Sequence, residues 1–256
     1  MSVSLQKANF WKRFSAYLFD TVCVICVAMA LVLLFSVVFQ TDKYTNEYNA
    51  YRAEYAEKYE INLKLTKEEY DAFTEAEKKA YDDTYAAFSE ALLGDKRVQE
   101  VNAKILTLTV SSVSLSLFIA TLGVHFIMPL VFKNGQTLGK KIFSLAVVRT
   151  STVKVSSPVL FVRSMLGLYA IETMFPLLLV YMIFIGILGS VGWITIGLFF
   201  ILQIFVMIRT QGSSIHDLLS DTAVVDMVSQ RIFSSDEELM EFQKEEAAQK
   251  AGATEK

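Results

Sequence analysis

Four ionisable side chains fall inside long apolar stretches of this sequence: Asp20, His125, Arg163 and Glu172. Charged groups at membrane depth are expensive, and they often mark ion pathways or proton relays. A carboxylate and an imidazole are the usual parts of a relay, because their pKa values can be moved towards neutrality. We therefore take these four residues as a candidate ion or proton site.

The same charges also fit a structural role, in which they lock the helices to one another. Arg13 and Asp20 are seven positions apart, roughly 10 Å along a helix, so each is expected to find its partners on other helices. Arg13 also fits an anchor at the lipid headgroups. Arg163 begins its own apolar stretch at about the depth of Asp20. We predict that these two charges face each other or share a water molecule.

Two prolines accompany the candidate site. Pro129 follows His125 by four residues, and Pro176 follows Glu172 by four. A proline in a helix has no N–H, so the carbonyl four residues earlier loses its partner. We predict that each proline opens a polar pocket, as in the broken helices of transporters. The alternative is that membrane helices simply tolerate prolines.

The helices that must position these residues are membrane spans. The chain is 53 % hydrophobic with a mean hydropathy of +0.40, too apolar for an ordinary soluble domain. About 20 apolar residues cross a bilayer. The predicted organisation is an interfacial segment with the first span at 1–40, an insert at 41–104, the second span at 105–132, a basic loop at 133–157, the third span at 158–185, the fourth at 193–208, and a closing segment with an acidic tail at 209–256.

The 41–104 insert is predicted to be helical and extracytoplasmic. Its tyrosines recur at helical spacing from Tyr44 to Tyr59, and Thr66 and Thr74 each begin a capping-box pattern. Such aromatic stripes usually form a core, although a ligand-binding surface is the alternative.

The 133–157 loop holds five Lys or Arg residues and no acid, which predicts that it lies in the cytoplasm with both termini. Ile142–Arg149 and Val153–Val155 are β-prone and predict a short hairpin, which Thr222–Val225 could join. The glycines and lysine of the loop, Gly135, Gly139 and Lys140, lack the spacing of a phosphate-binding loop. Cys23 and Cys26 are interpreted as small apolar residues within a span.

Three motifs in order resemble the RDD family of mostly bacterial, polytopic membrane proteins. The family is named for an arginine and two aspartates, and Arg13 and Asp20 match its first motif in spacing. Gly135 to Val148 resembles its glycine–lysine loop, and His216 to Val225 resembles its closing segment, with the last aspartate at Asp217. Asp217 also fits a helix or turn cap. Some members are proposed to exchange sodium or other cations for protons.

We therefore expect an all-α membrane protein of the cell membrane, a four-helix bundle with a helical insert and a small cytoplasmic β-hairpin. Its function is expected to be a small transporter or cation/proton exchanger; the alternative is a non-enzymatic scaffold. No nucleophile–base pair or metal-ligand spacing appears in the sequence, so we expect no enzyme, metal or cofactor. The lipid bilayer is the expected partner. A homo-oligomer and a protein partner of the insert remain open, and nucleic acid is not expected.

Overall fold

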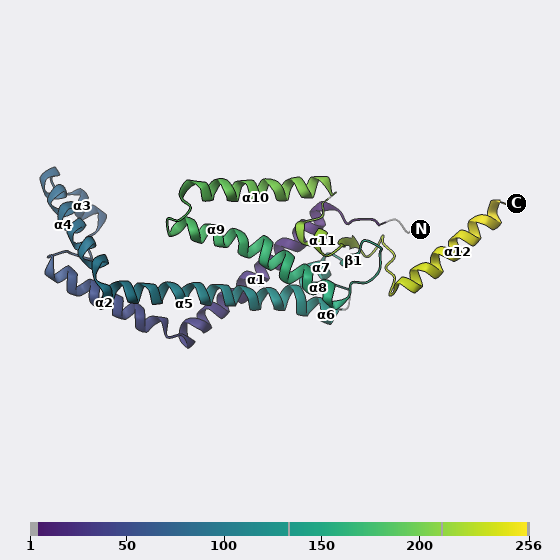
Figure 1. Cartoon of the computed structure of the whole chain (residues 1–256), viewed down its shortest axis with the longest axis horizontal. Coiled ribbons are helices and arrows are strands. Elements are labelled where there is room, and N and C mark those ends of the chain that lie inside the picture. Colours follow the sequence, from purple (N-terminus) through teal and green to yellow (C-terminus); the bar gives the residue numbers. More distant parts are fainter. Residues whose placement is uncertain (1–4, 133, 211, 255–256) are drawn as a thin grey trace. The chain divides into compact units, whose positions relative to one another are not determined.

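The computed structural model describes residues 5–132, 134–210 and 212–254 and is mostly helical (Figure 1). Four helical stretches in it are long and apolar enough to cross a membrane: Phe10–Val38, Lys96–Phe132, Ser157–Phe184 and Gly189–Arg209. Each of the four predicted spans falls on one of these helices. The chain forms two compact units, Met1–Val27 with Leu117–Lys256 (the site unit) and Ala28–Ser116 (the insert unit).

The insert unit contains the later part of α1 (Phe10–Val38), α2 (Thr41–Lys58), α3 (Lys67–Asp71), α4 (Glu75–Gly94) and the first part of α5 (Lys96–Thr121). Its core is built on Phe88, Leu92 and Val98, and the side chains packed against it are Tyr48, Tyr51, Tyr55, Tyr59 and Tyr81. Both predicted capping boxes are present, at Thr66 and Thr74. The tyrosine stripes therefore serve as core, as their helical spacing favoured.

The site unit contains helices that change their hydrogen-bonding pattern along their length. α5 continues through the π-helical η1 (Leu122–Ile127) into α6 (Met128–Phe132). α8 (Ser157–Phe161) continues through the π-helical η2 (Val162–Met174) into α9 (Phe175–Phe184). Each π-helical segment ends just before a proline, at Pro129 and Pro176. These helices therefore run on past the prolines with a wider turn before each of them.

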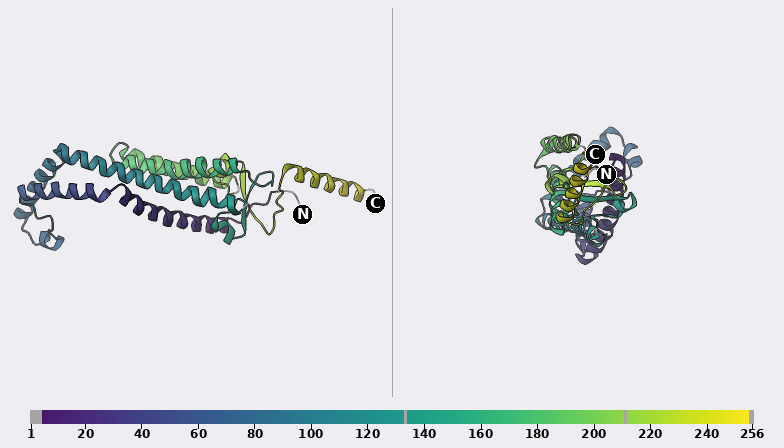
Figure 2. Two further views of the ribbon diagram at one scale, coloured as in Figure 1. Left: turned by 90° about the horizontal axis from the view of Figure 1, so that it is seen from below. Right: turned by 90° about the vertical axis from the view of Figure 1, so that its right-hand side faces the viewer.

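α10 (Gly189–Arg209) completes the apolar helices and lies beside α9. The two are joined by a short turn, and both views of the chain place them next to each other (Figures 1 and 2). Two short helices, α7 (Leu138–Ile142) and α11 (Ile215–Leu219), lie with the sheet at one end of the site unit. α12 (Asp236–Thr254) ends the described chain.

The sheet pairs segments that are far apart in sequence. β1 (Leu145–Arg149) is antiparallel to β2 (Thr222–Asp226), with Val147 opposite Val224. The predicted hairpin between Ile142–Arg149 and Val153–Val155 is present only as one antiparallel bridge, Val148 to Lys154, whereas Thr222–Val225, which was expected to be able to join it, lies in the paired strand. Alternate residues of β1 enter two different buried clusters, so both faces of the strand need cover. Ala8 and Ala16 pack against one face of the sheet, and Leu5 and Ile232 pack against the other.

Candidate functional site

Asp20 is fully buried on α1, and its partners come from the start of α7. One carboxylate oxygen accepts a hydrogen bond from the Thr137 hydroxyl. The other accepts one from the backbone N–H of Gly139, at 2.8 Å. A Cβ atom at Gly139 would lie 2.3 Å from the carbonyl oxygen of Ala16, so only glycine allows this close approach. Asp20 therefore fastens α7 to the first span.

Lys140 supplies the opposite charge for Asp20. Its Nζ lies 3.7 Å from the Asp20 carboxylate, and the lysine side chain is only 14 % exposed. Burial lowers the pKa of Lys140, and the Asp20 carboxylate opposes that shift. The pairing explains why a lysine follows the glycine in this loop. Gly135, the other loop glycine, has left-handed backbone, and a Cβ there would lie 2.9 Å from Val147.

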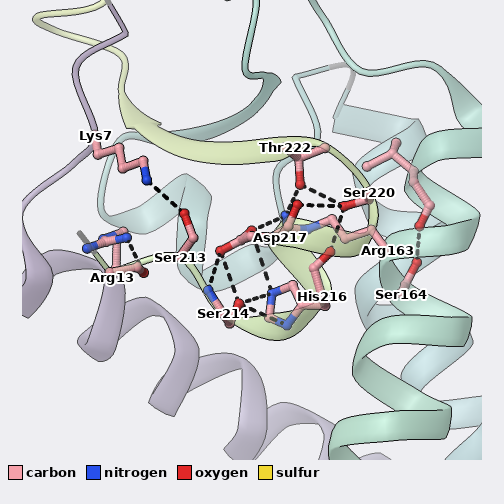
Figure 3. A network of polar contacts seen from close by, with 12 residues as sticks. Lys7, Arg13, Arg163, Ser164, Ser213, Ser214, His216, Asp217, Ser220 and Thr222 are labelled. Carbon is pink, nitrogen blue, oxygen red and sulfur yellow. Dashed lines mark hydrogen bonds and ion pairs between the residues drawn. The ribbon is translucent and has the colours of Figure 1, made fainter. Parts of the chain in front are cut away.

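Arg163 binds Asp217 (Figure 3). The guanidinium of Arg163 donates to the carboxylate of Asp217 and to the hydroxyl of Thr222, and both charged residues are buried. The expectation that Arg163 faces Asp20 is wrong as a direct pairing. Asp217 follows the fourth span closely, and α11 brings it back against the third.

Asp217 also caps α11, as its sequence position suggested. Its second oxygen accepts from the backbone N–H of Ser214, at 3.0 Å. Burial by itself raises the pKa of Asp217, but the Arg163 guanidinium and the Ser214 hydrogen bond hold it well below its usual value. Asp217 is therefore a permanently charged partner of Arg163 at neutral pH.

Glu172 reaches the same short helix. Its two carboxylate oxygens contact the backbone N–H and the ring Nδ1 of His216, each at 2.9 Å. Both side chains are about one-eighth exposed, at 12 %. The sequence placed Glu172 in the interior of the third span and gave His216 no role. The structure makes them a carboxylate–imidazole pair.

The π-helical form of η2 is what aligns these contacts. Its i→i+5 hydrogen bonding widens the turn to roughly 4.4 residues. Arg163 and Glu172 are nine positions apart within η2, about two such turns, so they lie on one face. In an α-helix of 3.6 residues per turn, nine positions make about two and a half turns, which would place them on opposite faces.

Gly167 lies between Arg163 and Glu172 on that face, where α11 comes closest. A Cβ atom there would be 2.5 Å from the Cβ of His216 and 2.7 Å from its Cα. Arg163, Gly167 and Glu172 thus form one contact strip for α11, with an ion pair on each side of a glycine. α-Helical periodicity could not have predicted this strip.

His125 lies near the same cluster, outside its ion pairs. It lines a small cavity of about 30 Å³ together with Tyr17, Lys140, Arg163 and His216. The structure therefore brings three of the four predicted ion-site residues to one cluster. His125 and Arg163 line the cavity, and Glu172 joins the cluster through its contact with His216. Asp20 lies behind Lys140, one contact further away.

Arg13 binds the segment that follows the fourth span. Its Nη1 donates to the carbonyl oxygen of Gly212, at 2.6 Å. Lys7 reaches the same segment, donating to the Ser213 hydroxyl (Figure 3). It also donates to the Thr210 carbonyl. Arg13 therefore makes a specific contact, which the interpretation as a headgroup anchor did not include.

The sequence analysis missed two members of the cluster, His216 as the partner of Glu172 and Lys140 as the partner of Asp20. The signal for His216 was its place beside Asp217, in a short segment returning to the membrane surface. Among the residues that the structure describes, no group of three or more His, Cys, Asp or Glu could hold a metal ion.

A comparison with protein-family models matches residues 7–221 to the RDD family. The match spans Arg13, Asp20, the loop with Gly139 and Lys140, and Asp217. A comparison with curated proteins found no match, and a comparison with solved structures found none either.

Proposed function

The chain belongs to the RDD family, and from that premise we propose that it is a multi-pass membrane protein that exchanges a small cation or solute for protons. In this proposal the proton is carried by the pair of Glu172 and His216. Lys140 and His125 lie next to that pair, around the small cavity.

The observation that carries the proposal is the direct contact between a carboxylate and an imidazole at the end of the apolar helices. These two groups are the usual parts of a proton relay in membranes. The adjoining cavity of about 30 Å³ has room for about one or two water molecules, and His125 lines its other side. A proton on His216 would thus have a short route towards His125.

Asp20 is a weaker candidate for the carrier, although it was part of the predicted site. Thr137, Gly139 and Lys140 approach its carboxylate from three directions. These contacts join the start of α7 to α1 and engage both oxygens of the carboxylate. The proposal therefore gives Asp20 the role of holding α7.

We propose that the sheet, α7, α11 and both termini face the cytoplasm of a cell-membrane protein. The support is the basic 133–157 loop, since positive loops near spans stay inside. A cysteine introduced near Tyr70 should react with an impermeant thiol reagent in intact cells, and one near Lys154 should not. The reverse labelling would contradict the orientation.

The direct test is flux in vesicles. Proteoliposomes with a trapped pH dye should show cation-driven proton movement with the unmodified protein and lose it with Glu172→Gln. Glu68→Gln is the matched control, because it makes the same substitution at an exposed glutamate of α3, in the insert unit. If the unmodified protein moves no more protons than empty vesicles, the transport function is wrong.

A second candidate function is a non-enzymatic scaffold, which a different observation favours. Arg13, Asp20 and Asp217 are each held by contacts that fasten segments outside the spans to the apolar helices. Under this candidate, the insert or the acidic tail binds a protein partner, and Glu172 only helps to hold α11. Absence of flux, with stability lost in Glu172→Gln, would favour the scaffold.

A further inference from the structure

Two cavities of the site unit share a boundary. The larger lies between α1, η2, α10 and α11 and has a volume of about 340 Å³, and the smaller, beside His125, has a volume of about 30 Å³. Glu172 lines the larger cavity and His125 the smaller one. A proton that moves between these two residues therefore crosses the boundary. Within the described part of the chain, four side chains line both cavities: Tyr17, Lys140, Arg163 and His216.

The charges around this boundary are balanced. The charged and titratable side chains that line the two cavities beside Tyr17 are three cations, two carboxylates and two imidazoles: Arg13, Lys140, Arg163, Glu172, Asp217, His125 and His216. Asp20 adds a third carboxylate from behind Lys140. Lys140 is thus paired with Asp20, and Arg163 with Asp217. With three carboxylates against three cations, charge alone makes neither an anion site nor a cation site here.

The four boundary side chains differ in what their polar atoms can do. A paired ammonium or guanidinium group donates hydrogen bonds and has no acceptor, so it cannot take up another proton. A neutral imidazole donates at one ring nitrogen and accepts at the other, and a phenol oxygen can do both at once. Of the four, His216 and Tyr17 can therefore receive a proton and pass one on. His216 is the partner of Glu172, so Tyr17 is the next transfer point towards His125.

The position of Tyr17 is fixed by two contacts of its own helix. Arg13 and Asp20 lie four residues before and three residues after it, so all three lie on one face of α1. Arg13 binds the carbonyl oxygen of Gly212, and Asp20 accepts from the backbone N–H of Gly139. Tyr17 lines the larger cavity and is 49 % exposed, so water in that cavity can reach its side chain. The two motif residues of α1 thus hold a half-exposed phenol at the boundary.

We propose that Tyr17 relays the proton between the Glu172–His216 pair and His125, an inference that rests on the proposed exchange function. The ring N–H proton of protonated His216 passes through cavity water to the Tyr17 oxygen. The O–H proton of Tyr17 passes through water in the smaller cavity to a ring nitrogen of His125. His216 ends neutral and His125 ends protonated. Tyr17 and the water molecules each give up one proton and gain one, so their charge does not change.

The test compares variants in proteoliposomes with a trapped pH dye, driven by a sodium or a potassium gradient. Tyr17→Phe keeps the ring and removes the hydroxyl, so it should keep the thermal midpoint of the parent and lower the initial rate of proton movement at least about tenfold. Tyr181→Phe is the matched control, because Tyr181 lies in the third span and lines neither cavity. It should move protons as the parent does.

A second variant separates a relay from a packing role. Difluorotyrosine in place of Tyr17 keeps the ring and the hydroxyl, and its phenol is more acidic than that of tyrosine. A relaying phenol that ionises at lower pH also stops passing protons at lower pH. The alkaline limb of the pH–rate profile should therefore move to lower pH, whereas a side chain that only packs leaves the profile in place.

Proton movement by a folded Tyr17→Phe variant at the rate of Tyr181→Phe would overturn the relay. An unchanged alkaline limb in the difluorotyrosine variant would also overturn it, and this result decides the question if Tyr17→Phe does not fold. If the unmodified protein moves no more protons than empty vesicles, the exchange function fails and the relay fails with it. An active parent with an equally active Tyr17→Phe variant refutes the relay alone, so the two failures can be told apart.

Discussion

Replacing Gly167 by alanine should separate α11 from the third apolar helix. The added Cβ would lie 2.5 Å from the Cβ of His216, whereas ordinary contacts begin at 3.4 Å. The shortfall is about 0.9 Å, and the two nearest atoms are the Cβ and backbone Cα of His216, which cannot rotate away. One of the two backbones has to move.

The movement acts on both ion pairs that flank the glycine. Arg163–Asp217 and Glu172–His216 each join η2 to α11, so a shift of α11 lengthens both. Overpacking of a close contact typically costs about 1–3 kcal/mol. We expect Gly167→Ala to lose stability within or somewhat above that range, because weakened buried pairs add to it.

The measurement is the midpoint of heat-induced loss of the monodisperse peak in size-exclusion chromatography. Gly197→Ala on α10 is the matched control, since a Cβ there meets nothing within 4 Å. Alanine in a helix interior is favoured over glycine by about 0.5–1 kcal/mol, so the control should be neutral or slightly more stable. If Gly167→Ala were as stable as Gly197→Ala, the close docking of α11 on η2 would be refuted.

Three further predictions follow from the same cluster. Asp20→Asn leaves the Lys140 ammonium buried without its counter-charge and should cost roughly 3–5 kcal/mol, part of which Lys140→Met should restore in the double variant's thermal midpoint. The pKa of Asp217 is lower in the folded protein than in the unfolded chain. The ionised Asp217 carboxylate therefore adds its full contribution to the free energy of unfolding above its unfolded pKa of about 3.9. That contribution is lost as the pH falls through the lowered pKa of the folded protein. A thermal-midpoint series down to pH 3 should therefore fall less steeply for Asp217→Asn than for the parent. Pro176→Ala should let the end of η2 return to α-helical spacing and reduce the coupling of Glu172 to its partner, measured in a double-mutant cycle.

The sequence was sufficient for features that depend on local pattern. Apolar length alone located the four spans, and Thr66 and Thr74 were recognisable as helix caps from the glutamates three residues later. Thr222–Val225 was recognised as β-prone. These features depend on neighbours within a few residues, which is where sequence patterns are informative.

The partners of charged residues could not be predicted in the same way. Arg163 was matched to Asp20 on depth in the membrane, whereas its partner is Asp217, 54 positions later in the sequence. A shared depth in the membrane restricts the position of a partner only along the direction perpendicular to the bilayer. The remaining choice depends on how α11 docks, and that depends on the π-helical turn of η2. A hydrophobic period near 3.6 residues carries no information about such a turn.

The family-motif residues Arg13, Asp20 and Asp217 make structural contacts, and the proposed proton exchange is assigned to other residues. Each of the three holds a segment outside the spans, and a residue that holds a segment has to keep its partner throughout any cycle. In the exchange proposal the proton is carried instead by the contact between Glu172 and His216, and this contact lies on the α11 contact strip beside the ion pair of the motif residue Asp217. Exchange and scaffold functions therefore share one architecture, and they differ in whether this pair releases its proton while Asp217 remains bound.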